Sequence, residues 1–212
     1  MGKPRLTLDE TKAMLLHVSA KMIESKDLLT KADQAIGDGD HGIGMARGFE
    51  AVQQKLSAQS FAALDELFKT VGSALLMSVG GAAGAVFGTL FRGGAKGLSG
   101  LHEFDAKALS LFLTDGLQAV KDRGKATLGD KTMVDALEPA ALKSAELTTG
   151  PLDQALAAVA EAARQGMEKT KEIIAATGKA KTLGERSLGH PDPGAVSTWL
   201  ILKFILEYAT QP

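Results

Sequence analysis

The apolar residues of this chain recur at helical spacing, and this periodicity restricts the fold more than any other feature. Near the N-terminus they repeat every seven residues, at Leu8, Leu15, Met22, Leu29 and Ile36. Residues at this spacing share one face of an amphipathic helix. Thr7 and Glu10 have the spacing of a capping box, and Gly37 is a typical residue for ending a helix. We therefore predict one long helix over residues 8–36.

The rest of the chain repeats this helical pattern between glycine-rich and polar breaks. Further helices are predicted at about 43–56, 61–79, 81–95, 104–121, 132–146 and 152–174, and from 193 onward. No segment shows the alternation of a half-buried strand. The sequence therefore predicts an all-α fold, an antiparallel bundle or barrel of about eight helices, with glycine and aspartate in the connections. We expect one domain over residues 1–212.

Composition excludes several classes of protein. The 24 Lys and Arg residues nearly balance 25 Asp and Glu residues, without a basic stripe, so neither a nucleic acid nor a membrane surface is an expected partner. The chain has no cysteine, which removes disulfides and thiolate zinc sites. Because the N-terminal residues lack the apolar core of a signal peptide, we expect a cytoplasmic protein.

One segment resembles a membrane span. Residues 70–91 carry no charge, and Gly80, Gly84 and Gly88 have the spacing of packed transmembrane helices. The adjacent Gly80 and Gly81 would weaken a helix at the middle of a bilayer. We therefore prefer two helices of a water-soluble bundle, with the membrane span as the alternative.

The chemistry of the chain is concentrated in the acidic stretch from Asp33 to Gly42. Asp33, Asp38 and Asp40 lie within eight residues, and the intervening glycines allow a tight turn to bring their carboxylates together. Oxygen ligands favour a hard cation, and Mg²⁺ sites commonly combine a few carboxylates with water or phosphate oxygens. We infer a site for Mg²⁺ with a nucleotide.

Of three other interpretations of this stretch, the first stays open, the second is disfavoured and the third fails. Aspartate and glycine also favour ordinary solvated turns. Gly37, Gly39 and Gly42 match a dinucleotide fingerprint, but a helix rather than the required strand precedes them. An EF-hand loop counted from Asp38 would place Phe49 where a bidentate glutamate is needed.

Three later connections could complete a phosphate site. Residues 81–84 open a helix with small side chains, so an anion could approach the free N–H groups, although close helix packing explains them as well. Residues 123–132 form a turn that leads into the next helix, at whose start Thr132 and Asp135 have the spacing of a capping pair. Residues 178–194 form a basic loop that could cover phosphates or merely be solvated. If the helices alternate in direction, all these connections meet at one end of the bundle.

The motifs in these connections resemble the nucleotide-binding L subunits of dihydroxyacetone kinases. The resemblance rests on the following segments, in this order: Asp33-x₄-Asp38-Gly39-Asp40-His41-Gly42, Gly80-Gly81-Ala82-x-Gly84, Gly129-Asp130-Lys131-Thr132-Met133 and Gly184-Glu185-Arg186-Ser187-x-Gly189-His190-x-Asp192-Pro193-Gly194-Ala195. It extends over essentially the whole chain.

This resemblance implies an eight-helix barrel that binds ADP or ATP at one end. It implies two Mg²⁺ ions held by Asp33, Asp38 and Asp40, which would be the catalytic carboxylates, and Arg186 as the cationic phosphate contact. The nucleotide would be held by His41, Gly42, Ile43, Gly44, Ala82, Ala83, Gly124, Met133, Arg186, Asp192, Pro193 and Gly194.

The resemblance also implies partners and an activity. A separate K subunit would bind the ketose covalently through a histidine, and this chain would donate the phosphoryl group to it, as part of glycerol metabolism. The donor would be ATP or a subunit of the phosphotransferase system, and the ketose dihydroxyacetone or a relative such as erythrulose. The alternative is a regulatory module that reports its ADP state to a transcription regulator. Gly44 and Ala83 depart from the Asn and Ser common in the family and each removes a polar side chain.

Overall fold

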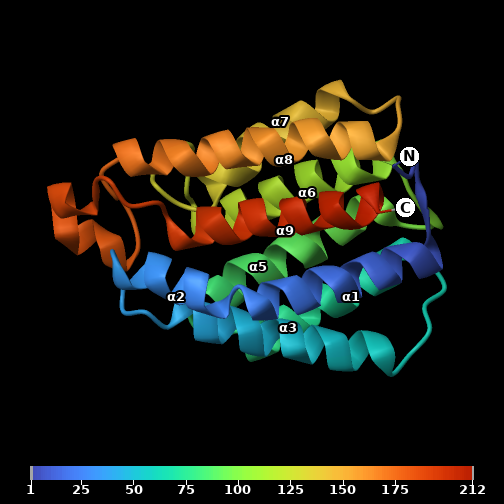
Figure 1. Cartoon of the computed structure of the whole chain (residues 1–212), viewed down its shortest axis with the longest axis horizontal. Coiled ribbons are helices and arrows are strands. Elements are labelled where there is room, and N and C mark those ends of the chain that lie inside the picture. Colours follow the sequence, from blue (N-terminus) through green and yellow to red (C-terminus); the bar gives the residue numbers. More distant parts are fainter. Residues whose placement is uncertain (1, 212) are drawn as a thin grey trace.

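A computed structural model describes residues 2–211, and almost all of its regular structure is helical (Figure 1). The α-helices are α1 (Leu8–Glu24), α2 (Lys26–Gln34), α3 (His41–Ser57), α4 (Leu64–Ser78), α5 (Gly81–Gly94), α6 (Ala106–Gly124), α7 (Val134–Glu146), α8 (Leu152–Lys169) and α9 (Pro193–Thr210). Short 3₁₀ segments are η1 (Ala95–Leu98), η2 (Thr170–Glu172) and η3 (Lys179–Ser187). Strands β1 (Leu6–Thr7) and β2 (Glu103–Phe104) form one antiparallel pair, with Leu6 opposite Phe104. The predicted all-α fold is confirmed.

The predicted first helix is wrong in one respect, because it is divided at Ser25. The Ser25 hydroxyl donates to the Lys21 carbonyl at 2.8 Å, and its backbone leaves the helical conformation at φ −80° and ψ 2°. A serine side chain that hydrogen-bonds to the preceding turn bends or ends a helix. Helices α1 and α2 therefore follow each other end to end and together occupy one place in the bundle, which leaves eight helical positions among the described residues.

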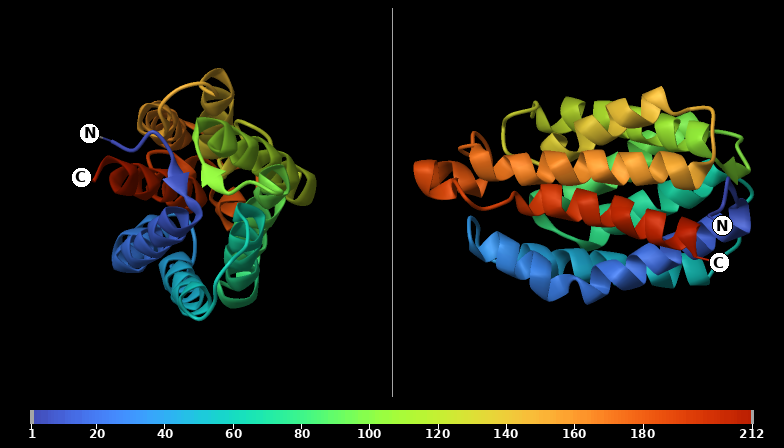
Figure 2. Two further views of the ribbon diagram at one scale, coloured as in Figure 1. Left: turned by 90° about the vertical axis from the view of Figure 1, so that its right-hand side faces the viewer. Right: turned by 45° about the horizontal axis from the view of Figure 1, so that its top comes forward.

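The helices form a closed ring in the order of the sequence. Each of α3 to α9 packs against the helix before it, and α9 then packs against α1 and α2. The end-on view in Figure 2 shows this barrel-like arrangement. Because successive helices alternate in direction, four connections share one end of the ring: α2–α3, α4–α5, α6–α7 and α8–α9. The strands β1 and β2 lie at the other end.

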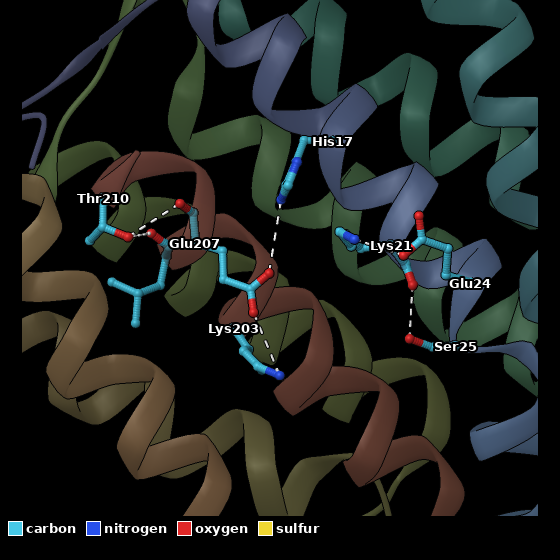
Figure 3. Close-up of polar contacts among 8 residues, drawn as sticks. His17, Lys21, Glu24, Ser25, Lys203, Glu207 and Thr210 are labelled. Atoms are coloured by element: carbon cyan, nitrogen blue, oxygen red, sulfur yellow. Dashed lines mark hydrogen bonds and ion pairs between the residues drawn. The ribbon is translucent and has the colours of Figure 1, made fainter. Parts of the chain in front are cut away.

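Polar side chains cross the α1–α9 seam that closes the ring (Figure 3). The His17 Nε2 atom on α1 lies 4.0 Å from a carboxylate oxygen of Glu207 on α9. Lys203 approaches the other oxygen of Glu207 at 3.5 Å, one turn earlier on α9. The side chains of this seam are partly exposed, at 20% for His17 and 37% for Glu207.

One continuous apolar core fills the barrel. Within it, the phenyl ring of Phe68 has its centroid 4.8 Å from that of Phe112, 5.5 Å from that of Phe104 and 6.1 Å from that of Phe91, so α4, α5, α6 and β2 meet there. The apolar residues of the helix predicted at 152–174 are buried from Leu152 through Met167. The predicted end of this helix is wrong, because α8 ends at Lys169 and Ile174 is 47% exposed.

The uncharged stretch 70–91 divides between α4 and α5. Gly80 lies between them at φ +85°, a conformation that glycine adopts without strain. A Cβ added to Gly88 would lie 2.7 Å from the Leu76 Cβ and 2.9 Å from the Gly72 carbonyl oxygen. The glycines therefore let α4 and α5 pack with their main chains close together. Among the described residues, no helix combines the length and apolarity needed to cross a membrane.

Replacing Gly88 by valine should force α4 and α5 apart. Overpacking of this kind costs about 1–3 kcal/mol, so we expect a lower free energy of unfolding in denaturant titrations. Gly150→Val is the matched control, since a Cβ at Gly150 meets nothing within 4 Å. Equal stability of the two variants would contradict close packing as the reason for Gly88.

Candidate functional site

A cavity of about 630 Å³ opens at the end of the ring where the four connections meet. Its walls come from each of these connections and from the ends of the helices that they join. Thirteen of the predicted site residues line it: Asp33, Asp38, Asp40, His41, Ile43, Gly44, Ala82, Ala83, Gly124, Met133, Asp192, Pro193 and Gly194. The convergence expected from alternating helix directions is therefore present in the structure.

The acidic turn brings the three predicted carboxylates together at one edge of this cavity. One oxygen each of Asp33, Asp38 and Asp40 lies within 4.8 Å of the others. Asp33 is 9% exposed in the last turn of α2, whereas Asp38 and Asp40 are exposed in the connection to α3. Gly37 lies against the Asp33 carboxylate, where a Cβ would be 2.1 Å from its oxygen, and Gly39 turns the chain at φ +80°. Like charges at this separation repel, and a set of carboxylate oxygens fits Mg²⁺.

The residue that compensates these charges is Lys179, at the start of η3. Its ammonium group pairs with Asp38 and lies 3.8 Å from Asp40. The hydrogen bond from Lys179 lowers the pKa of Asp38, and the same bond raises the pKa of Lys179. The predicted basic loop contained this lysine, but no sequence motif distinguished it from the neighbouring cations. Only its position over the acidic turn distinguishes Lys179 from the other cations of the loop.

Two predicted residues lie elsewhere. Arg186 is exposed in η3 and is not part of the cavity wall, so its proposed phosphate contact remains a prediction. Gly42 is buried between α3 and α2, where a Cβ would lie 2.2 Å from the Lys26 carbonyl oxygen. The small size of Gly42 therefore serves helix packing. Gly44 also has a packing reason, because a Cβ there would lie 2.8 Å from the Val79 carbonyl oxygen.

Helix α5 presents its N-terminus to the cavity. The first intrahelical acceptor is Gly80, whose carbonyl binds the N–H of Gly84 at 2.9 Å, so the preceding N–H groups have no partner within the helix. The side chains of Ala82 and Ala83 are too small to cover them. An anion at this end would accept hydrogen bonds from the free N–H groups and would also lie at the positive end of the helix dipole.

The opposite wall contains a buried lysine that the sequence motifs did not single out as a site residue. Lys131 is 2% exposed with φ +60°, and its ammonium donates to the carbonyls of Thr170 and, at 2.6 Å, of His190. Burial lowers the pKa of Lys131. This lysine therefore ties the α6–α7 turn to both ends of the α8–α9 connection. The predicted Thr132–Asp135 pair is present in part: the Asp135 carboxylate accepts the N–H groups of Thr132 and Gly129 at 2.7 and 2.6 Å, but the cap of α7 is Met133, without a side-chain cap hydrogen bond.

Asp192 is the N-cap of α9 and lines the cavity. Its carboxylate accepts the Ala195 N–H at 2.8 Å. Burial raises the pKa of Asp192 to about 7, above the ordinary value of 3.8. Apolar side chains also line the cavity, namely Val86, Phe87, Val120, Ala126 and Val134. Their sequence pattern is that of core residues, so only the fold identifies them as part of the cavity lining.

The fold and site define a helical barrel with an acidic cavity of nucleotide size at one end. Residues 35–207 match the DAK2 domain family, and the chain belongs to this family. The resemblance to dihydroxyacetone kinase L subunits that the motifs indicated is confirmed.

Similar proteins include separate subunits and longer enzymes. The ADP-binding subunit DhaL of the PEP-dependent dihydroxyacetone kinase 1 of Listeria innocua is 40% identical over 186 residues, 87% of this chain and 88% of that protein. The corresponding DhaL subunit of Escherichia coli is 38% identical over 84% of this chain and 86% of its own length. The crystal structure of the dihydroxyacetone kinase from C. freundii in complex with AMP-PNP and Mg²⁺ superposes with a TM-score of 0.73 at 28% identity. That match covers 92% of this chain, which spans only 33% of the C. freundii chain.

Asp192→Asn should change how stability depends on pH. The folded Asp192 carboxyl keeps its proton up to about pH 7, whereas the unfolded carboxyl releases it near 3.8, so this group makes folding less favourable as pH rises between these values. Asparagine keeps the helix cap without titrating. We expect the variant to gain stability relative to the natural chain between pH 5 and pH 7.5 in denaturant titrations. Parallel pH profiles would contradict the raised pKa.

Proposed function

We propose that this chain is the nucleotide-binding, phosphoryl-donating subunit of a kinase for dihydroxyacetone or a related small ketose such as erythrulose. Residues 1–212 would act as one domain. The observation that carries the proposal is the convergence of three carboxylates, a free helix N-terminus and a lysine around one cavity. The family membership and the kinase relatives support the same activity.

The acidic turn supplies the metal ligands in this proposal. Asp33, Asp38 and Asp40 would hold Mg²⁺, with two ions as the expected number, and the remaining ligand positions would be taken by water and phosphate oxygens. The metal, when bound, neutralises phosphate charge that would otherwise be repelled by the carboxylates. Asp33 is fixed by burial, so it would orient the site, whereas the exposed Asp38 and Asp40 can adjust to the ligand.

The nucleotide would lie along the cavity from the acidic turn to the apolar wall. The phosphates would meet the N–H groups at Ala82 and Ala83 and the start of α3 from His41 to Gly44. The base would contact Met133, Gly124 and the 192–194 segment. Lys179 would exchange its carboxylate partners for a phosphate when the metal takes its place between Asp38 and Asp40.

Catalysis in this arrangement is a matter of position and charge. Phosphoryl transfer needs the donor and acceptor oxygens in line and the developing negative charge stabilised. The described residues include no motif for binding a sugar, which supports a separate K subunit that holds the ketose covalently through a histidine. ADP kept in the cavity would be rephosphorylated by a phosphotransferase-system subunit, as the PEP-dependent relatives suggest, or would exchange with ATP.

Asp38→Ala and Asp40→Ala should each abolish phosphoryl transfer, with a loss on the order of 10²-fold or more, because the phosphate charge is no longer neutralised. Turnover is measured with the purified ketose-binding subunit, the ketose and each donor. Asp9→Ala, an exposed aspartate at the other end of the ring, is the control. Undiminished turnover of the cavity variants would refute the kinase role. Magnesium-dependent ADP binding without turnover in the natural chain would favour the regulatory alternative.

Lys179→Ala and Arg186→Ala test which cation of the loop serves the phosphate. Because only Lys179 faces the acidic turn, we expect its replacement to lower kcat at least about tenfold, and that of Arg186 to change it less. Both variants are assayed at saturating nucleotide with the ketose-binding subunit. A larger loss of kcat for Arg186→Ala than for Lys179→Ala would instead support Arg186 as the cationic phosphate contact that the motif suggested.

A further inference from the structure

The imidazole of His41 joins two parts of the cavity that are far apart in the sequence. His41 is the first residue of α3, directly after Asp40, and is only 9% exposed. Its Nε2 atom lies 2.7 Å from the Ser197 hydroxyl on α9. Phe87 of α5 lies beside the ring, with 6.3 Å between centroids. The imidazole is therefore buried between a hydrogen-bond partner on α9 and an aromatic ring on α5.

The main chain of the same residue contacts the acidic turn. The His41 N–H donates to the Asp33 carboxylate at 3.2 Å. Gly42 packs against α2, next to Thr30. This close contact fixes the position of the first turn of α3 relative to α2. A shift of the His41 ring would therefore move the N–H donor of Asp33 and the adjoining Asp40.

Ser197 is the partner on α9 that fixes this ring. Its side chain is completely buried, one turn into α9 from the Asp192 cap, and it does not line the cavity. A hydroxyl in such a place is costly unless it is hydrogen-bonded, and His41 provides the bond. Ser197 thus acts on the acidic turn only through His41.

We propose that Ser197 is a positioning residue for the metal site, which sets the geometry of Asp33 and Asp40 through the His41 imidazole. The inference rests on the proposed Mg²⁺–nucleotide function of the cavity. Groups that orient metal ligands from the next layer typically change metal affinity by 10–100-fold when they are removed. The α9 helix would in this way contribute to metal binding without supplying a ligand.

The test is the magnesium dependence of ADP binding by the full chain. Calorimetric titrations with ADP over a range of Mg²⁺ concentrations give the half-saturating Mg²⁺ concentration for the natural chain and for Ser197→Ala. We expect this concentration to rise about tenfold in the variant. ADP binding in the presence of EDTA should be unchanged, because the nucleotide contacts themselves are intact.

Ser19→Ala is the matched control, since Ser19 is equally buried but bonds only to the Leu15 carbonyl of its own helix. A double mutant separates positioning through His41 from a general loss of packing. In a His41→Phe background, Ser197→Ala should cause no further rise in the half-saturating Mg²⁺ concentration. Ser197→Thr, which keeps a hydroxyl, should restore the natural magnesium requirement and also serves if the alanine variant folds poorly.

Three results would overturn the inference: an unchanged magnesium requirement in Ser197→Ala, an equal loss of ADP binding with EDTA, or additive effects in the double mutant. A natural chain without any magnesium-dependent ADP binding would instead overturn the proposed function itself, so the two failures are distinguishable.

Discussion

Repulsion among three carboxylates is the constraint on which the cavity depends. Asp33, Asp38 and Asp40 lie close enough that their charges oppose one another, and the fold tolerates this because a cation stands among them. In the structure that cation is Lys179, which pairs with Asp38. In the proposed function, a divalent ion and a polyphosphate would take over the charge balance that Lys179 provides here.

Closure of the helical ring gives this acidic turn its surroundings. Helix α9 packs against α1 and α2, and so its N-terminal segment lies beside residues that precede it by more than 150 positions. Beside this junction, the hydrogen bond between His41 and Ser197 links the start of α3 to α9. Lys131 makes an equivalent link on the other side, because its buried ammonium binds carbonyls at both ends of the α8–α9 connection. Two buried polar groups thus hold the cavity wall together from opposite sides.

Glycine has two separate uses in this architecture. In the connections it permits the turns that aim the aspartates, as at Gly39 with its positive φ. Inside the helices it lets main chains approach closely, as Gly88 does between α4 and α5 and Gly42 between α3 and α2. The second use explains why an uncharged, glycine-rich stretch belongs to a helical bundle. It also explains why Gly42 belongs to the acidic motif without lining the cavity.

The sequence by itself determined the helices, the acidic turn and the connections that form the cavity, because periodicity and local turn chemistry are properties of neighbouring residues. It did not determine the break at Ser25, where a side-chain hydrogen bond to the preceding turn interrupts the apolar pattern. Nor did it determine the end of α8, beyond which Ile174 is exposed although it continues the apolar pattern. Only the tertiary structure decided which cation faces the carboxylates, and which buried polar groups support them. Lys179, Lys131 and Ser197 look like ordinary residues of their segments, and their roles arise from contacts between parts of the chain that no local pattern relates.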